Sequence, residues 1–233
     1  MNRQFAALAA VATMVLGPTA GLCDTQMLHC MSKVAEPKQP PGSFQDQPKE
    51  YWRIGTTAVR ILEAVDPKTK VQQLAIAVPP DLWTIYLAKK EGVHVVVPKV
   101  PAPLPVFPGQ GAVAQKLQGL NYGSELSYFQ SKSAKKTPGQ SFNGHLADLY
   151  VVPIDATMKL SLFADPKTNK PMRIAVTDNK GKSVAVEYLV YETLPADMSL
   201  FKPPQGVKIT DAKTAAAKAP GKVPAPKSSS RGK

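Results

Sequence analysis

The chain carries the same turn signal twice, each time between two apolar stretches. Asp-Pro-Lys-Thr occupies positions 66–69 and again positions 165–168, and a further lysine follows each copy within two residues. The Asp side chain accepts hydrogen bonds from the backbone that follows it, and Pro fixes φ near the value that a turn needs. Each copy therefore predicts a β-hairpin. The arms are residues 58–65 with 71–78, and 158–163 with 172–178.

Further alternating apolar stretches extend both hairpins into antiparallel meanders. The turn at 178–182 leads from the second hairpin into a third arm. The remaining strands are expected at 51–54, 82–88, 93–97, 146–152 and 183–192. Residues 109–138 break this pattern, and Ser124-Glu125 predicts the start of a short helix within them.

A helix is also predicted ahead of the first meander, over residues 24–35. Its apolar residues recur at i, i+3, i+4 and i+7, which is the spacing of one helical face. They are Met27, Cys30, Met31 and Val34.

Residues 1–23 have the pattern of a secretory signal peptide. Arg3 precedes an uncharged run over 5–16, and small residues follow it as far as position 21. The run is shorter than the roughly twenty residues that a membrane span requires. Cleavage is expected between positions 20 and 23, which predicts an exported, periplasmic protein.

Cys23 and Cys30 are the two cysteines, and an exported compartment permits a disulfide between them if Cys23 is retained. On a continuous helix their Cα atoms would lie about 10 Å apart, beyond the roughly 7 Å that a disulfide tolerates. A bridge therefore needs a break in the predicted helix. His29 beside Cys30 lacks the further ligands of a metal site, so neither a metal nor a cofactor is expected.

The end of the chain, residues 210–233, reads as a disordered basic tail. Residues 202–233 hold eight basic residues and one acidic residue, which is +7 of the total net charge of +12. Lys, Ala, Pro and Ser cannot bury enough apolar surface to fold. We expect the tail to contact an anionic membrane or cell-wall surface. Nucleic acid is not an expected partner, because the tail has no aromatic residue on which a base stacks.

Catalytic patterns are scarce in this sequence. It contains no nucleophile elbow, no HExxH motif and no glycine-rich phosphate loop. His145 and Asp148 would make a general base with its orienting carboxylate, but residues three apart face opposite sides of a strand. A non-enzymatic protein is therefore predicted, with a hydrolase that uses His145 as the less favoured alternative.

The last apolar stretches follow a distinctive order. Phe-Ala-Asp-Pro-Lys at 163–167 leads through Asn-Lys-Gly-Lys at 179–182 into a long strand. Phe201 then precedes Pro-Pro-Gln-Gly at 203–206 and a short final stretch that ends at Ile209. This order resembles the closing hairpins of the periplasmic outer-membrane lipoprotein-carrier superfamily, and 81–97 is similar to the middle strands of that group. The resemblance covers most of 51–209.

The resemblance implies a mainly β fold of the α+β type. Its centre would be a curved, incompletely closed antiparallel β-sheet, or half-barrel, with a few short helices as a lid over an apolar concave face that receives acyl chains. Carrier members use an arginine within the sheet as a polar handle, and Arg53 and Arg60 are the nearest matches. The domains would be a signal peptide (1–23), a short helix with a proline-rich linker (24–50), a carrier-like domain (51–209) with an insertion at 98–140, and the tail.

One strand face offers an apolar strip for such a ligand. Trp83, Ile85 and Leu87 alternate along their strand, so their side chains point to one side. Both faces of this strand must be covered, and the residues leave open which face is concave. The candidate ligand-contacting residues are Trp52, Trp83, Ile85, Leu87 and Arg60. Packing in an ordinary core is the competing interpretation of both tryptophans.

These observations predict an exported, non-enzymatic protein that binds a lipid or an acylated protein in an apolar concavity, in envelope lipid or lipoprotein trafficking. The alternative is an envelope structural or interaction protein whose basic tail docks to an anionic surface.

Overall fold

The computed structural model describes residues 25–97, 103–107 and 112–212, in which twelve strands form a single sheet. The first six are β1 (Gln26–Glu36), β2 (Lys49–Ile54), β3 (Ala58–Leu62), β4 (Gln73–Val78), β5 (Asp81–Tyr86) and β6 (Glu91–Val96). The others are β7 (Lys135–Phe142), β8 (His145–Pro153), β9 (Met158–Ala164), β10 (Pro171–Asp178), β11 (Ser183–Pro195) and β12 (Lys208–Asp211). The helical segments are η2 (Leu87–Lys89), α1 (Ala112–Lys116), α2 (Glu125–Ser131) and η3 (Met198–Phe201).

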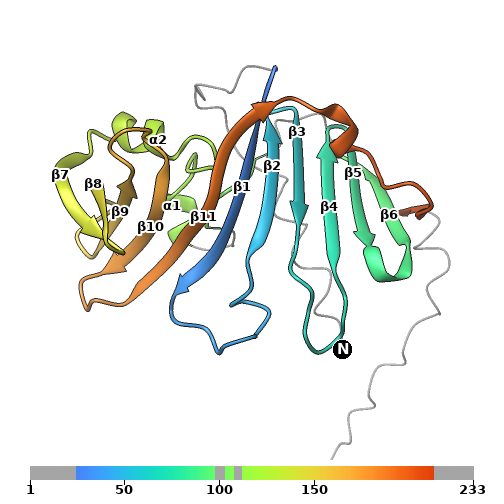
Figure 1. Ribbon diagram of the computed structural model, residues 1–233, viewed down its shortest axis with the longest axis horizontal. Coiled ribbons are helices and arrows are strands. Elements are labelled where there is room, and N and C mark those ends of the chain that lie inside the picture. The colour runs from blue at the N-terminus through green and yellow to red at the C-terminus, as the bar shows by residue number, and fades with distance from the viewer. Residues whose placement is uncertain (1–24, 98–102, 108–111, 213–233) are drawn as a thin grey trace, which may run out of the picture.

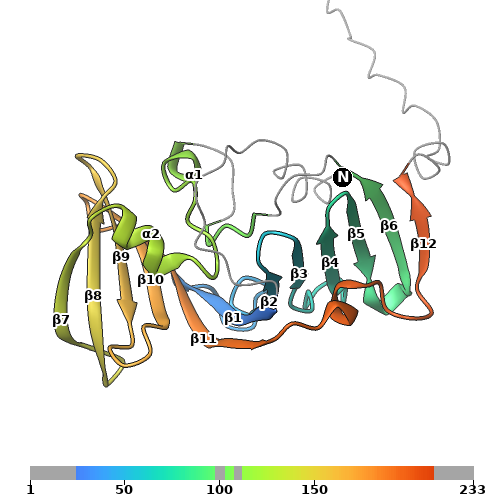
Figure 2. The ribbon, with the colours of Figure 1, turned by 90° about the horizontal axis from the view of Figure 1, so that it is seen from above.

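The sheet is curved and its two edges do not meet. Its order is β12-β6-β5-β4-β3-β2-β1-β11-β10-β9-β8-β7, and every neighbouring pair is antiparallel except β12 with β6 (Figure 1). Seen along the strands, it bends into a U with α1 and α2 inside the curve and η3 outside it (Figure 2). The predicted fold class, a mainly β, incompletely closed half-barrel, is therefore confirmed.

The repeated turn forms both predicted hairpins. Asp66 Oδ1 accepts the backbone N–H groups of Lys68 and Thr69 at 2.7 and 3.1 Å. In the second copy, Asp165 Oδ1 accepts those of Lys167 and Thr168 at 2.9 and 2.7 Å. The side chain thus replaces the hydrogen bonds that the reversing backbone lacks, as the sequence predicted.

The helix predicted over 24–35 is wrong, because this segment is strand β1. It lies between β2 and β11 near the middle of the sheet, and both of its faces contribute side chains to a core. Leu28 and Cys30 are buried on one face and Met27 on the other. A strand that is apolar on both faces also contains residues at helical spacing, and this ambiguity produced the error. The possible partner of Cys30 in a disulfide, Cys23, lies outside the described residues.

The predicted interruption at 109–138 contains the helix expected after Ser124, which is α2. It also contains α1 and the start of a strand, neither of which the sequence revealed. That strand, β7, forms the edge of the sheet, and its register with β8 shifts between Thr137 and Gln140. Pro138 and Gly139 lie at this shift. Proline and glycine are tolerated at an edge or a bulge, where a ladder hydrogen bond is absent.

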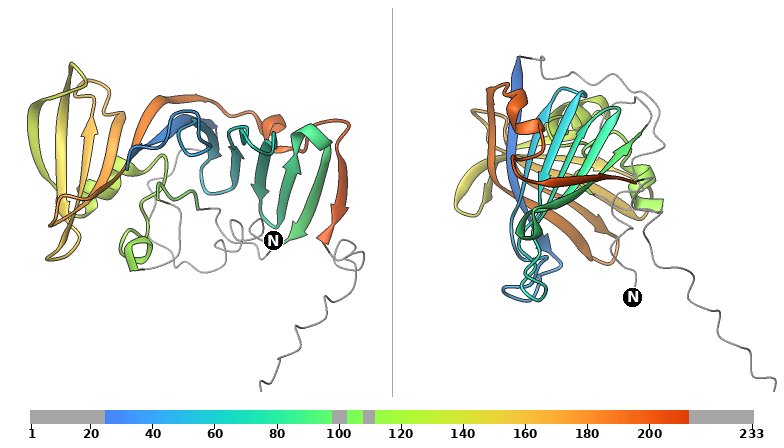
Figure 3. Two further views of the ribbon diagram at one scale, coloured as in Figure 1. Left: turned by 90° about the horizontal axis from the view of Figure 1, so that it is seen from below. Right: turned by 90° about the vertical axis from the view of Figure 1, so that its right-hand side faces the viewer.

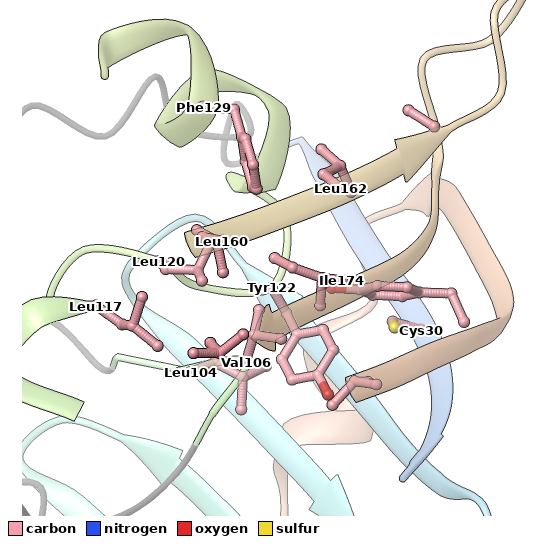
Figure 4. Packing of buried hydrophobic residues seen from close by; sticks show 14 of the residues in the cluster. Cys30, Leu104, Val106, Leu117, Leu120, Tyr122, Phe129, Leu160, Leu162 and Ile174 are labelled. Carbon is pink, nitrogen blue, oxygen red and sulfur yellow. The ribbon is translucent and has the colours of Figure 1, made fainter. Parts of the chain in front are cut away.

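One hydrophobic core lies on the inner, concave face of the sheet. Leu160, Leu162 and Ile174 of the sheet are fully buried there. They pack under Leu120 and Phe129, which belong to the segment inside the curve (Figure 4). This inner core covers β1, β2 and β8 to β11 and extends as far as Val59 of β3.

A second core lies on the opposite, outer face of the other half. Leu74, Ile76 and Ile85 are fully buried beneath Phe201 of η3. The chain reaches this position because the segment after β11 crosses the outside of the sheet before it adds β12 beside β6 (Figure 3). The molecule therefore buries the inner face of one half and the outer face of the other half.

Candidate binding site

The inner face of β3 to β6 presents a nearly continuous apolar surface, which we call the inner floor. The strand register aligns its side chains in two rows across four strands. The rows are Val59, Ala77, Leu82 and Val95, and Ile61, Ala75, Thr84 and Val93. Thr84 is the one polar member, so a ligand that lies on this floor would meet hydrocarbon almost everywhere.

The inner floor is less buried than the face behind it. On β4, Leu74 and Ile76 of the outer face are completely buried, whereas Ala75 and Ala77 of the floor are partly exposed. On β5, Ile85 is completely buried and its neighbour Thr84 is partly exposed. Two members of the floor are themselves buried, Leu82 and Val59, and Val59 joins the inner core. The other six are partly exposed, so the outer face is the main core in this half of the sheet and the floor remains partly accessible.

The structure brings the residues predicted from sequence together, but on the outer face. Ile85 is buried in the outer core, and Trp52, Trp83 and Leu87 pack against it under η3 and the segment that follows. The strip of Trp83, Ile85 and Leu87 thus lies on the convex side, so the inverse of the expected arrangement holds. The sequence could not show this, because the segment that covers Ile85 lies more than a hundred residues further along the chain.

The two arginines considered from sequence point in opposite directions. Arg60 lies on the outer face, donates to the backbone oxygen of Leu200 at 2.8 Å and stacks over Trp52. Arg53 lies on the inner face, is 5% exposed and donates to the backbone oxygens of Gly55 and Tyr122. Arg53, rather than Arg60, is the arginine on the concave side.

A buried carboxyl group beside Arg53 was not predicted. Glu125 begins α2 and is 1% exposed. Its two carboxyl oxygens accept the hydroxyl groups of Tyr188 at 3.0 Å and Tyr191 at 2.8 Å, and one of them also accepts the Gly123 N–H. Burial raises the pKa of Glu125 to about 7, although these hydrogen bonds act in the opposite direction.

A β-bulge in β11 allows both tyrosines to reach Glu125. Residues three apart on a regular strand face opposite sides, as Tyr188 and Tyr191 would. The pairing with β1 shifts at this point: Tyr188 faces Ser32 and Tyr191 faces Cys30, with Leu189 as the extra residue. Both hydroxyl groups therefore point to the inner face. The bulge depends on tertiary pairing, so regular alternation in the sequence could not reveal it.

The pair of His145 and Asp148, on which the less favoured hydrolase alternative depends, does not form. Asp148 is buried and binds Lys136 Nζ at 2.7 Å, while the side chain of His145 is exposed. His29 and Cys30 also point to opposite faces, since His29 stacks on Trp52 and Cys30 lies in the inner core. Among the described residues there is no group of His, Cys, Asp and Glu side chains that could hold a metal ion.

His94 binds a carboxylate on each side and fastens the last strand. Its Nε2 lies 2.8 Å from Asp81 of β5, its Nδ1 lies 2.8 Å from Asp211 of β12, and its ring stacks on Trp83. A neutral imidazole carries one N–H, so both contacts to ionised carboxylates require the protonated ring. The two aspartates accordingly raise the pKa of His94 above its ordinary value.

We expect β12 to loosen as the pH rises through the elevated pKa of His94. The contact is complete below the ordinary histidine value of 6.5 and is lost above the folded value, because the raised pKa favours the protonated, folded form. Amide hydrogen exchange of Thr210 and Asp211, measured across this range, should accelerate with pH beyond the intrinsic increase. In His94→Gln the exchange should be fast throughout, and an unchanged wild-type pH profile in that variant would contradict the assignment.

No protein-family model matches the chain, and no curated protein is significantly similar to it. An uncharacterized conserved protein from Thermus thermophilus is similar in structure, with a TM-score of 0.45 and 9% identity over 81% of this chain and 91% of that chain. The MucA/MucB complex of Pseudomonas aeruginosa matches with a TM-score of 0.40 and 17% identity, over 76% of this chain and 56% of that chain.

A LolA superfamily protein from Nitrosomonas europaea matches with a TM-score of 0.29 and 14% identity, over 80% of this chain and 91% of that chain. It is described as a member of the superfamily that the sequence resembles. At these values the likeness transfers no function to this chain. None of the described helices is long and apolar enough to cross a membrane.

Proposed function

We propose that this is an exported, non-enzymatic protein that binds the acyl chain of a lipid or of a lipidated protein on its inner floor. The observation that carries the proposal is the division of the sheet into two halves with opposite cores. Because η3 covers the outer face of β3 to β5, the outer core is complete without the inner floor. The floor joins the inner core through Val59, against which Ile61 and Ala77 pack, and Ala75, Thr84, Val93 and Val95 lie outside both cores. Seven of its eight side chains are apolar, which suits a hydrocarbon ligand and no charged one.

Two further features support this function. The first 23 residues have the composition of a cleavable signal peptide, which fits a periplasmic location. The small side chains Ala75 and Ala77 lie between the larger Val59 and Ile61 on one side and Leu82 on the other. These two alanines of β4 lower the centre of the floor, so an extended acyl chain can approach the sheet closely there.

The direct test is saturable uptake of a fluorescent fatty acid by the purified protein. Ala75→Trp should weaken uptake by about tenfold or more, since displacing two methylene groups from an apolar contact costs roughly that factor. Ala88→Trp is the matched control, because Ala88 is exposed in η2 outside the floor. It should leave uptake unchanged. A wild type without saturable uptake, or equal losses in both variants, would refute the proposal.

A further inference from the structure

Five lysines gather at one end of the strands that carry the inner floor. Antiparallel strands alternate in direction, so the β3–β4 and β5–β6 connections and the start of β12 share this end. Direct hydrogen bonds join them, from Leu87 N–H to the Gln72 oxygen at 3.0 Å and from Lys208 N–H to the Lys90 oxygen at 2.9 Å. We call the set the lysine rim, and it consists of Lys68, Lys70, Lys89, Lys90 and Lys208.

The lysine rim keeps its positive charge exposed. All five side chains are exposed, and none forms an ion pair with another described residue. Two carboxylates at this end of the strands oppose the charge of the five lysines. One is Asp66, which accepts backbone N–H groups of its own turn, and the other is Glu91. Glu63 is paired with Lys49 at 2.6 Å. The rim therefore retains an excess of positive charge that the fold does not use.

At the opposite end of the same strands, the described residues include no lysine. The β2–β3 and β4–β5 connections, residues 55–57 and 79–80, contain no charged residue. Asp81, which begins β5, and Asp211, which ends β12, also lie at this end and are the two aspartates bound to His94. Among the described residues of β3 to β6, β12 and their connections, the exposed lysines thus lie at one end of the floor.

An exposed apolar residue accompanies the lysines. Val65 lies in the β3–β4 connection, immediately before the repeated turn, and is 41% exposed. Proteins that rest on membranes combine basic side chains near the headgroups with apolar side chains that enter the interface. The rim provides both on adjacent turns.

We propose that the lysine rim docks this protein onto an anionic lipid bilayer, with the end of the inner floor turned toward the membrane. The proposal rests on the proposed function in one respect, since it takes the floor as the site that receives the lipid. Along the strands, the floor becomes more polar toward the rim, where Gln73, Tyr86 and Glu91 form the next row. A bound acyl chain would then extend away from the membrane over the two apolar rows.

The repeated turn supplies an unusually close control for this proposal. Lys68 and Lys70 follow the first Asp-Pro pair, at the rim. Lys167 and Lys170 follow the second pair, between β9 and β10 in the other half of the sheet. Two full-chain double variants, K68Q/K70Q and K167Q/K170Q, therefore lose the same charge from turns of the same kind. The basic tail is present in both.

Binding is measured by sedimentation with vesicles of phosphatidylcholine that contain or lack phosphatidylglycerol. Each lysine close to anionic lipid contributes roughly fivefold to affinity, so K68Q/K70Q should bind the anionic vesicles about tenfold or more weakly. K167Q/K170Q should bind within about twofold of the wild type, and high salt should reduce wild-type binding. Adding substitutions of Lys89 and Lys90 should deepen the loss.

Equal affinities of the two double variants would overturn the proposal, whether both match the wild type or both fall, because the rim would then have no special role. Uptake of the fluorescent fatty acid in vesicle-free solution separates this result from the proposed function. K68Q/K70Q should take up the fatty acid normally. Failed uptake in the wild type with intact rim-dependent docking would refute the proposed function alone.

Discussion

Ile85→Glu is expected to abolish cooperative folding, whereas Thr84→Glu, one residue away, is expected to leave a folded protein that no longer takes up fatty acid. Ile85 is completely buried beneath Phe201, so the new carboxylate would have no partner and no water. Core changes of this kind cost about 4 to 5 kcal/mol or more, a large part of the roughly 5 to 15 kcal/mol that stabilises a typical domain.

Thr84 belongs to the inner floor and is partly exposed, so a glutamate there can remain hydrated. Its cost to folding should stay within about 1 kcal/mol, as for other substitutions at accessible positions. The charge would nevertheless lie between Ala75 and Val93, in the path of an acyl chain. Thermal unfolding and fatty-acid uptake measured on both variants test the assignment. A folded Ile85→Glu protein that has lost uptake would instead place the ligand on the outer face.

The free energy of unfolding should fall by about 3 kcal/mol between roughly pH 4.5 and pH 7 because of Glu125 alone. Burial raises the pKa of this carboxyl from 4.5 to about 7 in the folded protein. The folded state therefore holds a proton that the unfolded state has released, and stability declines as the pH rises through this interval. Arg53, Tyr188 and Tyr191 face the carboxyl, and of these Arg53 is the one charged group.

Glu125→Gln is the control, because a neutral amide of the same shape cannot titrate. Denaturant unfolding of both proteins, at about pH 5 and about pH 8, gives two differences in stability whose comparison isolates Glu125. His94 titrates in both proteins and cancels. The wild type should lose more stability than the variant over this interval, and an identical loss in the two proteins would show that Glu125 does not carry the proton.

The hairpins and their turns could be predicted from sequence because the interactions that form them are local. Asp66 and Asp165 bind amides two and three residues ahead, and neither needs any other part of the chain. The predicted strands of both meanders accordingly agree with the structure to within a few residues at each end. The short helix after Ser124 is also where its starting signal placed it.

The errors share a different physical origin, which is contact between distant segments. β1 was predicted as a helix because its pattern reflects burial on two faces, Leu28 and Cys30 in the inner core and Met27 in the outer core. Glu125 was not predicted as a buried group because a bulge at Leu189, more than sixty residues away, brings two tyrosines to it.

The candidate site shows most clearly which features follow from local sequence and which depend on contacts between distant segments. The alternation of Leu82 to Leu87 determined by itself that two sets of side chains lie on opposite faces of one strand and that both sets are largely apolar. Which set became core was decided by η3, since Phe201 covers Ile85 and leaves the face of Thr84 to the concave side. Alternation along a strand is a local property of the backbone, whereas the choice between its two faces depends on where a distant segment packs.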